Sequence, residues 1–183
     1  MRPFVEVLMT VHDDEQAKRT ERAREVGLFR YALVRAAADP ALSPRQRGAL
    51  VREVAARTRL LATVGTFEFL RRSGRVTKLQ AYAATMLDIK PVFEFRNGDA
   101  VPIARTRTRR RALAQIVGDT LREAGTSSLH LAVIHAAAEQ EARDLLDRIV
   151  ASANVVERLV TEVTPVIGAH TGPGLVGTAF YRE

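Results

Sequence analysis

A glycine-rich segment near the end of the chain places two polar side chains in a stretch of bare backbone. Residues 168–174 read Gly-Ala-His-Thr-Gly-Pro-Gly, so His170 and Thr171 lie between glycines. Glycine has no Cβ atom, which lets the backbone approach another group closely or adopt a positive φ. An imidazole, a hydroxyl and backbone N–H groups can all donate hydrogen bonds to an anion. Two interpretations stay open from these residues alone, an anion-binding loop and a tight turn between two strands.

A second segment could contribute a cation to such a site. Residues 73–75 read Ser-Gly-Arg and follow a short helical pattern that ends near Arg72. The guanidinium of Arg75 would offer a rigid fork of donors that matches a carboxylate. Taken alone, the same step is also typical of a capped helix end with both arginines in solvent.

Other kinds of chemistry find no support in the sequence. The chain has no cysteine, which excludes disulfides, thiolate catalysis and cysteine-based metal sites. His12, His130 and His135 have no metal-ligand spacing with one another. No serine-nucleophile elbow, phosphate-binding loop or dinucleotide glycine pattern occurs. We therefore expect no catalytic residue, no metal and no cofactor.

The composition is that of a globular protein. Hydrophobic residues make up 46% of the 183 residues, which is enough to build a core. The N-terminus lacks a signal-peptide pattern, and no apolar run approaches the roughly 18 residues of a membrane span. We expect a cytoplasmic protein without stable membrane insertion. The net charge of +7 favours anionic partners but does not choose among them.

Hydrophobic periodicity and turn residues predict the order of elements. Ser43 as N-cap and Pro44 at the first position begin a helix, Asn97-Gly98 marks a hairpin, and Gly125 ends a helix. The pattern predicts an α+β fold with a mixed, largely antiparallel sheet flanked by helices and preceded by a helical hairpin. The expected helices are 13–38, 44–57, 67–72, 78–87, 108–124 and 139–151, and the expected extended segments are 60–64, 90–96, 100–104, 129–135, 155–163, 165–167 and 176–181.

From about residue 60 onward, the chain resembles the DegV family. The resemblance rests on motifs that occur in the family's order, and the last glycine motif is close to diagnostic. The motifs are Phe-Leu-Arg-Arg-Ser-Gly-Arg-Val-Thr at 69–77, Ile-Lys-Pro at 89–91, Arg-Thr-Arg-Thr-Arg-Arg at 105–110, residues 168–174, and Gly-Thr-Ala-Phe-Tyr at 177–181.

The resemblance implies a fatty-acid carrier without catalytic activity, which presents its ligand to a separate fatty-acid kinase. The fatty acid would lie in this domain, with its carboxylate near Arg75 and His170, and Thr171 and Gly172 complete the candidate ligand-binding residues. A buried carboxylate is costly unless it is hydrogen-bonded or paired, so such donors are needed. The apolar residues expected to divide between core and acyl-chain lining are Leu87, Ile89, Val92, Phe93, Val133 and Val166.

Residues 1–57 depart from the family pattern. They lack its Asp-Ser-Thr opening and its Ser-Ser-Gly-Leu-Ser-Gly-Thr-like loop, and they more loosely resemble the helix-turn-helix region of actinobacterial transposases. We therefore expect residues 1–57 to form a helical extension and residues 58–183 a DegV-like lipid-binding domain, truncated by loss of the family's first domain.

The basic N-terminal helices leave an alternative function open. Arg45, Arg47 and Arg52 could contact DNA phosphates, which would make the chain a DNA-binding protein. A solvated basic helix pair or a dimerisation element fits the same residues equally well. A sheet face left uncovered would favour a homo-oligomer.

Overall fold

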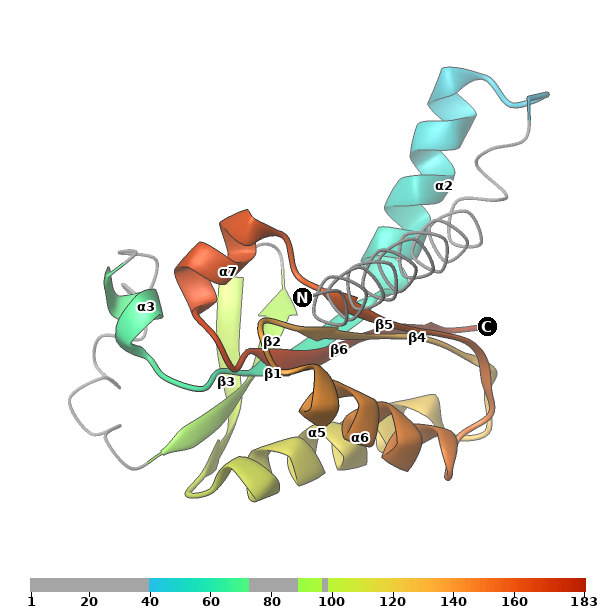
Figure 1. Cartoon of the computed structure of the whole chain (residues 1–183). Coiled ribbons are helices and arrows are strands. Elements are labelled where there is room, and N and C mark those ends of the chain that lie inside the picture. Colours follow the sequence, from blue (N-terminus) through green and yellow to red (C-terminus); the bar gives the residue numbers. More distant parts are fainter. Residues whose placement is uncertain (1–39, 73–88, 97–98) are drawn as a thin grey trace, which may run out of the picture. The chain divides into compact units, whose positions relative to one another are not determined.

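The computed structural model of the chain describes residues 40–72, 89–96 and 99–183 (Figure 1). The described strands are β1 (Arg59–Thr63), β2 (Lys90–Arg96), β3 (Asp99–Thr106), β4 (Leu129–His135), β5 (Val155–Glu162) and β6 (Val176–Arg182). The described helices are α2 (Pro44–Arg57), α3 (Glu68–Arg72), α5 (Arg109–Ala124), α6 (Glu139–Val150) and α7 (Pro165–Thr171). The predicted helices 13–38 and 78–87 and the Asn97-Gly98 turn lie outside the described residues.

The chain divides into two compact units, residues 1–53 and residues 54–183. Most of α2 belongs to the first unit, and a capping box fixes its start. The backbone N–H of Ser43 donates to Gln46 Oε1 at 2.9 Å, and the backbone N–H of Gln46 donates to Ser43 Oγ at 3.4 Å. The predicted N-cap at Ser43 is therefore confirmed.

The six-stranded sheet of the described residues has the order β3-β2-β1-β6-β4-β5. All neighbouring strands pair antiparallel except β4 and β5, which are parallel and joined through α6. A parallel pair needs such a crossover, whereas the antiparallel β2 and β3 are joined directly. The predicted mixed, largely antiparallel sheet of an α+β fold is confirmed.

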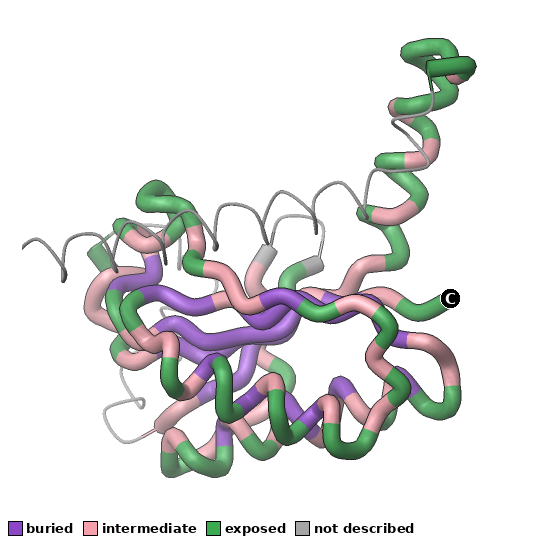
Figure 2. Tube along the Cα trace, turned by 45° about the vertical axis from the view of Figure 1, so that its right-hand side comes forward, coloured by how far each residue is buried: buried purple, intermediate pink, exposed green. Residues whose placement is uncertain are grey.

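Side chains of the strands alternate between two apolar clusters. The larger cluster packs against α5 and α6 and includes Leu131 and Phe180 of the sheet with Ile116 and Leu145 of the helices. Figure 2 shows this buried layer along the strands and on the inner sides of α5 and α6. A smaller cluster, which we call the α3-side cluster, is formed by Ala62, Val64, Phe93, Ala136 and Leu175, with Leu60, Phe67, Leu70, Ala100 and Val163 packed against it.

Helix α5 begins and ends as the sequence predicts. Thr108 is its N-cap, and the side-chain oxygen accepts a hydrogen bond from the backbone N–H of Arg111 at 3.2 Å. Gly125 follows the last residue with φ of 55°, a left-handed conformation that favours glycine. These two caps place α5 across the sheet, so that its buried Thr120 reaches Thr178 of β6.

One predicted element is wrong. Residues 165–167 were expected to be extended, but they form the first turn of α7. The cause is the position of Pro165, whose fixed φ and missing N–H suit the first position of a helix as well as they suit an extended segment. The β-branched Val166 and Ile167 favoured the extended interpretation, yet both are exposed on the helix.

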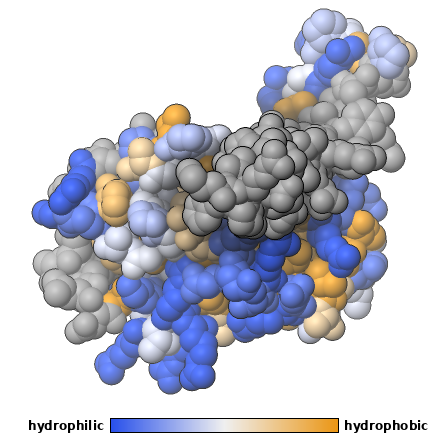
Figure 3. Space-filling view, in the orientation of Figure 1, coloured by the Kyte–Doolittle hydropathy of each residue, from blue (hydrophilic) through white to orange (hydrophobic). Residues whose placement is uncertain are grey.

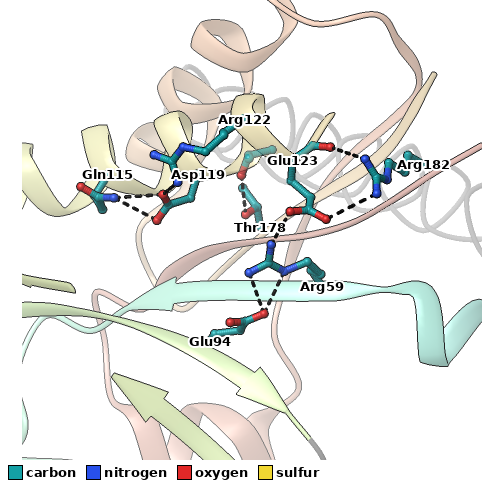
Figure 4. A network of polar contacts seen from close by, with 9 residues as sticks. Arg59, Glu94, Gln115, Asp119, Arg122, Glu123, Thr178 and Arg182 are labelled. Atoms are coloured by element: carbon teal, nitrogen blue, oxygen red, sulfur yellow. Dashed lines mark hydrogen bonds and ion pairs between the residues drawn. The ribbon is translucent and has the colours of Figure 1, made fainter. Parts of the chain in front are cut away.

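A polar network ties the sheet to the C-terminal part of α5 (Figure 4). Arg59 of β1 contacts Glu94 of β2 at 2.8 Å and Glu123 of α5 at 2.6 Å. Arg182 of β6 donates to the Glu123 backbone carbonyl at 3.0 Å. The Glu94 side chain is only 4% exposed, so Arg59 compensates a carboxylate that water scarcely reaches.

A second polar group lies where β4, β5 and β6 run side by side. The buried His130 ring stacks on Tyr181 with centroids 4.4 Å apart, and its Nδ1 lies 2.8 Å from Glu157 Oε2. Its Nε2 lies 3.1 Å from Glu183. Burial, together with the charge of Glu157, raises the pKa of Tyr181. This arrangement gives His130 Nδ1 a hydrogen-bond partner on β5 and leaves Nε2 near Glu183 without a hydrogen bond among the described residues.

We expect Arg59→Met to lower the free energy of unfolding by about 1–3 kcal/mol, because the buried Glu94 would lose the arginine that contacts it at 2.8 Å. Urea unfolding followed by circular dichroism measures the change. The control is Arg122→Met, which breaks a pair between Asp119 and an arginine that is 74% exposed, and which we expect to cost about 1 kcal/mol or less. Equal losses in the two variants would contradict this account.

Candidate functional site

The glycine motif, residues 168–174, spans the end of α7 and the turn into β6. The backbone N–H of Gly172 donates to Gly168 O at 2.8 Å and closes the helix. Gly172 has a φ of 72° and Gly174 has a φ of 84°, backbone conformations that residues other than glycine rarely adopt. Residues 172–174 form a turn, and this turn follows a helix rather than a strand.

Helix α3 packs directly against this turn. A Cβ atom on Gly172 would overlap the ring of Phe69, so the absence of a side chain at Gly172 is what allows α3 to approach. Figure 1 shows α3 and α7 as neighbours, and they are in contact. The packing places Phe69 of α3 directly against the glycine motif.

The predicted cation Arg75 lies outside the described residues. It follows the last residue of α3 by three positions. On α3 itself, Arg71 and Arg72 both bind Glu68, at 3.1 and 2.7 Å. The hydrogen bond from Arg71 lowers the pKa of Glu68. Both arginines of α3 are therefore paired within their own helix.

Backbone meets backbone on the other side of the turn. A Cβ atom on Gly65, just after β1, would lie 2.8 Å from Pro173 O. A Cβ atom on Gly174 would lie 3.1 Å from Gly65 Cα. Neither position has room for a side chain. The two glycines therefore let the backbone of the motif pack directly against the segment that follows β1. The sequence analysis did not single out Gly65.

Lys90 is a second residue that the sequence analysis did not assign to the site. Its Nζ donates to Gly65 O at 2.7 Å, so the ammonium group reaches the base of the glycine motif. The Ile-Lys-Pro motif at 89–91 was recognised, but only as a strand. The available signal was the position of a lysine at the start of an otherwise apolar strand.

The two predicted polar residues of the motif differ in what they offer. The His170 ring is half-buried, and within the described ranges no hydrogen bond or ion pair engages it. Thr171 is buried, and its hydroxyl donates to Ile167 O at 3.0 Å. In this conformation Thr171 offers only acceptor capacity, whereas His170 can donate to an anion.

The expected acyl-chain residues fall into different environments. Val92 and Val133 belong to the core beneath α5 and α6, and Phe93 belongs to the α3-side cluster. Ile89 is half-buried, and Val166 is 68% exposed on α7. The remaining candidate, Leu87, lies outside the described residues.

The residues considered for DNA binding are exposed on α2. They are Arg45, Arg47 and Arg52, and Arg47 donates to Leu42 O at 3.2 Å. In the basic run at 105–111, Arg109 is paired with Glu141 of α6 at 2.7 Å. This pairing gives at least one of the arginines in that run a structural role.

Metal binding and membrane crossing find no support among the described residues. No group of three or more His, Asp or Glu side chains is arranged to hold a metal ion there. Within the same ranges, no helix combines the length and the apolar character that crossing a membrane requires.

We expect Gly65→Ala to lower the free energy of unfolding by about 1–3 kcal/mol, because its Cβ would press on the Pro173 carbonyl. Chemical denaturation measures the change. Gly118→Ala is the matched control, since a Cβ there meets nothing within 4 Å, and in the middle of α5 alanine should stabilise by about 0.5–1 kcal/mol. A Gly65→Ala protein as stable as the parent would show that the glycine pair is not needed.

Comparison with known proteins gives one consistent result. The family model described as "Uncharacterised protein, DegV family" matches residues 23–183. A DegV domain-containing protein of Halalkalibacterium halodurans is 35% identical over 132 residues, which are 72% of this chain and 47% of that protein. A protein of Thermotoga maritima named "Fatty acid-binding protein" is 32% identical over 116 residues, 62% of this chain and 40% of that protein.

Among solved structures, the chain is similar to one reported as "Fatty Acid Binding of a DegV family Protein from Thermus thermophilus". The TM-score is 0.75 at 27% identity, and the match covers 87% of this chain and 57% of that chain. The chain thus spans about half the length of the curated relatives it matches.

The family match reaches further towards the N-terminus than the motifs that carry the resemblance. The resemblance was placed from about residue 60 onward, whereas the match begins at residue 23 and so includes α2. The division of the chain near residue 57 stays a prediction. The arginines on α2 lie within the family match, and none of the relatives named above is described as binding DNA. The ordered motifs, the sheet topology and a match over residues 23–183 agree, and the chain belongs to the DegV family.

Proposed function

We propose that this chain binds one long-chain fatty acid, with the carboxylate at the glycine motif and the acyl chain on the α3 side of the sheet. Membership of the DegV family supports the proposal, as do two of its relatives, which are named for fatty-acid binding. The structural observation that carries it is the His170 ring, which no described group engages although it is half-buried beside the packed α3–α7 pair.

The head-group end of the proposal follows from the cost of burying a charge. A carboxylate that leaves water must find donors, because an unpaired buried anion is unfavourable by several kcal/mol or more. His170 has a ring nitrogen to offer, whereas the backbone N–H groups of Gly168, Gly172 and Gly174 already donate to Thr164 O, Gly168 O and Ala136 O. Arg75 would complete the site as the charged partner, which remains a proposal because this residue lies outside the described ranges.

The acyl-chain end follows from the distribution of apolar side chains. The α3-side cluster holds Phe93 and Leu175 in its buried part, and Phe67 packs on Phe93 edge-to-face with centroids 5.9 Å apart. Figure 3 shows hydrophobic surface in the region of α7 and mostly hydrophilic surface over α5 and α6. Each buried methylene of an acyl chain contributes about 0.8 kcal/mol, so burial of a long chain against apolar side chains would supply most of the binding free energy.

The proposal includes how the chain acts. We infer a carrier without catalytic activity of its own, which would hand its ligand to a separate enzyme such as a fatty-acid kinase. The absence of cysteine suits a reducing compartment such as the cytoplasm. A boundary near residue 57 between a helical segment and the lipid-binding domain, and a homo-oligomeric state, are further parts of the proposal.

We expect His170→Ala to weaken palmitate binding by about tenfold, the loss of one hydrogen bond to a charged group. Isothermal titration calorimetry with detergent-free protein measures the dissociation constant. The control is Gln140→Ala, which replaces an exposed polar residue on α6 and should leave the affinity unchanged.

Two results would contradict the proposed function. Folded parent protein that takes up no long-chain fatty acid would rule it out for this chain. Equal palmitate affinity in the parent and His170→Ala, with both proteins folded by circular dichroism, would place the carboxylate somewhere other than the glycine motif.

A further inference from the structure

Lys90 connects the start of β2 to the seat of the glycine motif. Its half-buried side chain reaches across to β1's end, where Nζ donates to Gly65 O at 2.7 Å. The carbonyl that it holds belongs to the residue whose backbone contacts Gly174. Lys90 thereby fixes the peptide on which the glycine motif rests.

Among the described residues, the ammonium group of Lys90 has no carboxylate partner, unlike three arginines of β1, α3 and α5. Arg59, Arg71 and Arg109 each bind a glutamate, at 2.8, 3.1 and 2.7 Å. Within the described ranges, no carboxylate lies at ion-pair distance from Lys90, and its ammonium group donates to the neutral Gly65 carbonyl alone. An ammonium group has three donors, and a half-buried cation without a counter-ion is unfavourable until an anion approaches.

We propose that Lys90 is a positioning and specificity-determining residue, which holds the glycine motif in place and makes the site prefer an anionic head group. The inference rests on the proposed function, since it concerns the same site. Lys90 positions the glycine motif through its hydrogen bond to Gly65, and its positive charge attracts the anionic head group without direct contact.

The expected preference for an acid over an ester has an electrostatic basis. Electrostatic attraction acts over a distance, whereas packing requires direct contact. A positive charge in a partly desolvated place stabilises a nearby anion even without contact, because screening by water is reduced. The same charge has little effect on an uncharged ester of the same acyl chain. The ratio of the affinities for palmitate and methyl palmitate therefore isolates the contribution of Lys90 from the packing of the acyl chain.

The test uses the full chain and three substitutions. Lys90→Met removes the charge and the hydrogen bond and keeps the length of the side chain, whereas Lys90→Arg retains both. Arg122→Met is the matched control, because it removes one positive charge from an exposed pair near the C-terminal end of α5. Dissociation constants for palmitate and methyl palmitate are measured by displacement of a fluorescent fatty acid.

We expect Lys90→Met to lower the preference for palmitate over its methyl ester by about tenfold, the effect of losing one interaction with a charged group. Lys90→Arg should restore most of the preference, and Arg122→Met should leave it unchanged. If Lys90→Met does not fold, Lys90→Gln replaces it, since glutamine can still donate to Gly65 O. That variant should keep the fold and lose the preference.

The outcomes separate this inference from the function on which it rests. A parent protein that binds neither ligand refutes the proposed function, and the inference with it. A parent that binds palmitate, together with a Lys90→Met protein that loses affinity for acid and ester equally, leaves the function standing. That result would overturn the inference, because Lys90 would then act only on the fold.

Discussion

The site end of the sheet depends on one contact, the approach of the Gly65 backbone to that of Gly174. Strands β1 and β6 pair antiparallel from Arg59↔Phe180 to Thr63↔Val176, and just beyond the last pair neither chain carries a side chain at the point where they meet. The contact sets where the glycine motif leaves β6. Everything else at the site follows from it, because the motif must lie there for Gly172 to receive the ring of Phe69 and for α3 to pack on α7.

The opposite end of the sheet is held by charge rather than by bare backbone. There the buried Glu94 is compensated by Arg59, which also reaches Glu123, and Arg182 binds the same helix end. Ion pairs tolerate small displacements of side chains, whereas two touching backbones do not. The ion pairs of Arg59 can therefore adapt to small movements, whereas the Gly65–Gly174 backbone contact is rigid. The rigid contact lies where a ligand would need fixed geometry.

Most of the fold could be predicted from the sequence, because local signals and long-range packing agree for these elements. Thr108 and Gly125 mark the ends of α5, and alternating apolar residues mark the strands. Helix α7 was missed because Pro165 begins a helix and an extended segment equally well. The glycine motif was predicted as a candidate site, whereas Gly65 and Lys90 were not, because they approach the motif only when β1 and β2 are assembled in the sheet. The spacing of residues along the chain does not predict contacts between distant segments such as these. Residues 23–57 are a related case, because a weak helical pattern can resemble more than one family.

The strand order leaves β3 and β5 as the outer strands of the described sheet. An outer strand presents unpaired N–H and C=O groups, and other chains can add to it in open-ended stacks. Strand β3 contains Pro102, which lacks an N–H, and β5 carries Glu157, Arg158 and Glu162. Both features oppose the addition of a further strand, the first by removing a donor and the second by repulsion between stacked like charges. These residues of β3 and β5 would therefore disfavour open-ended stacking through the outer strands of the described sheet.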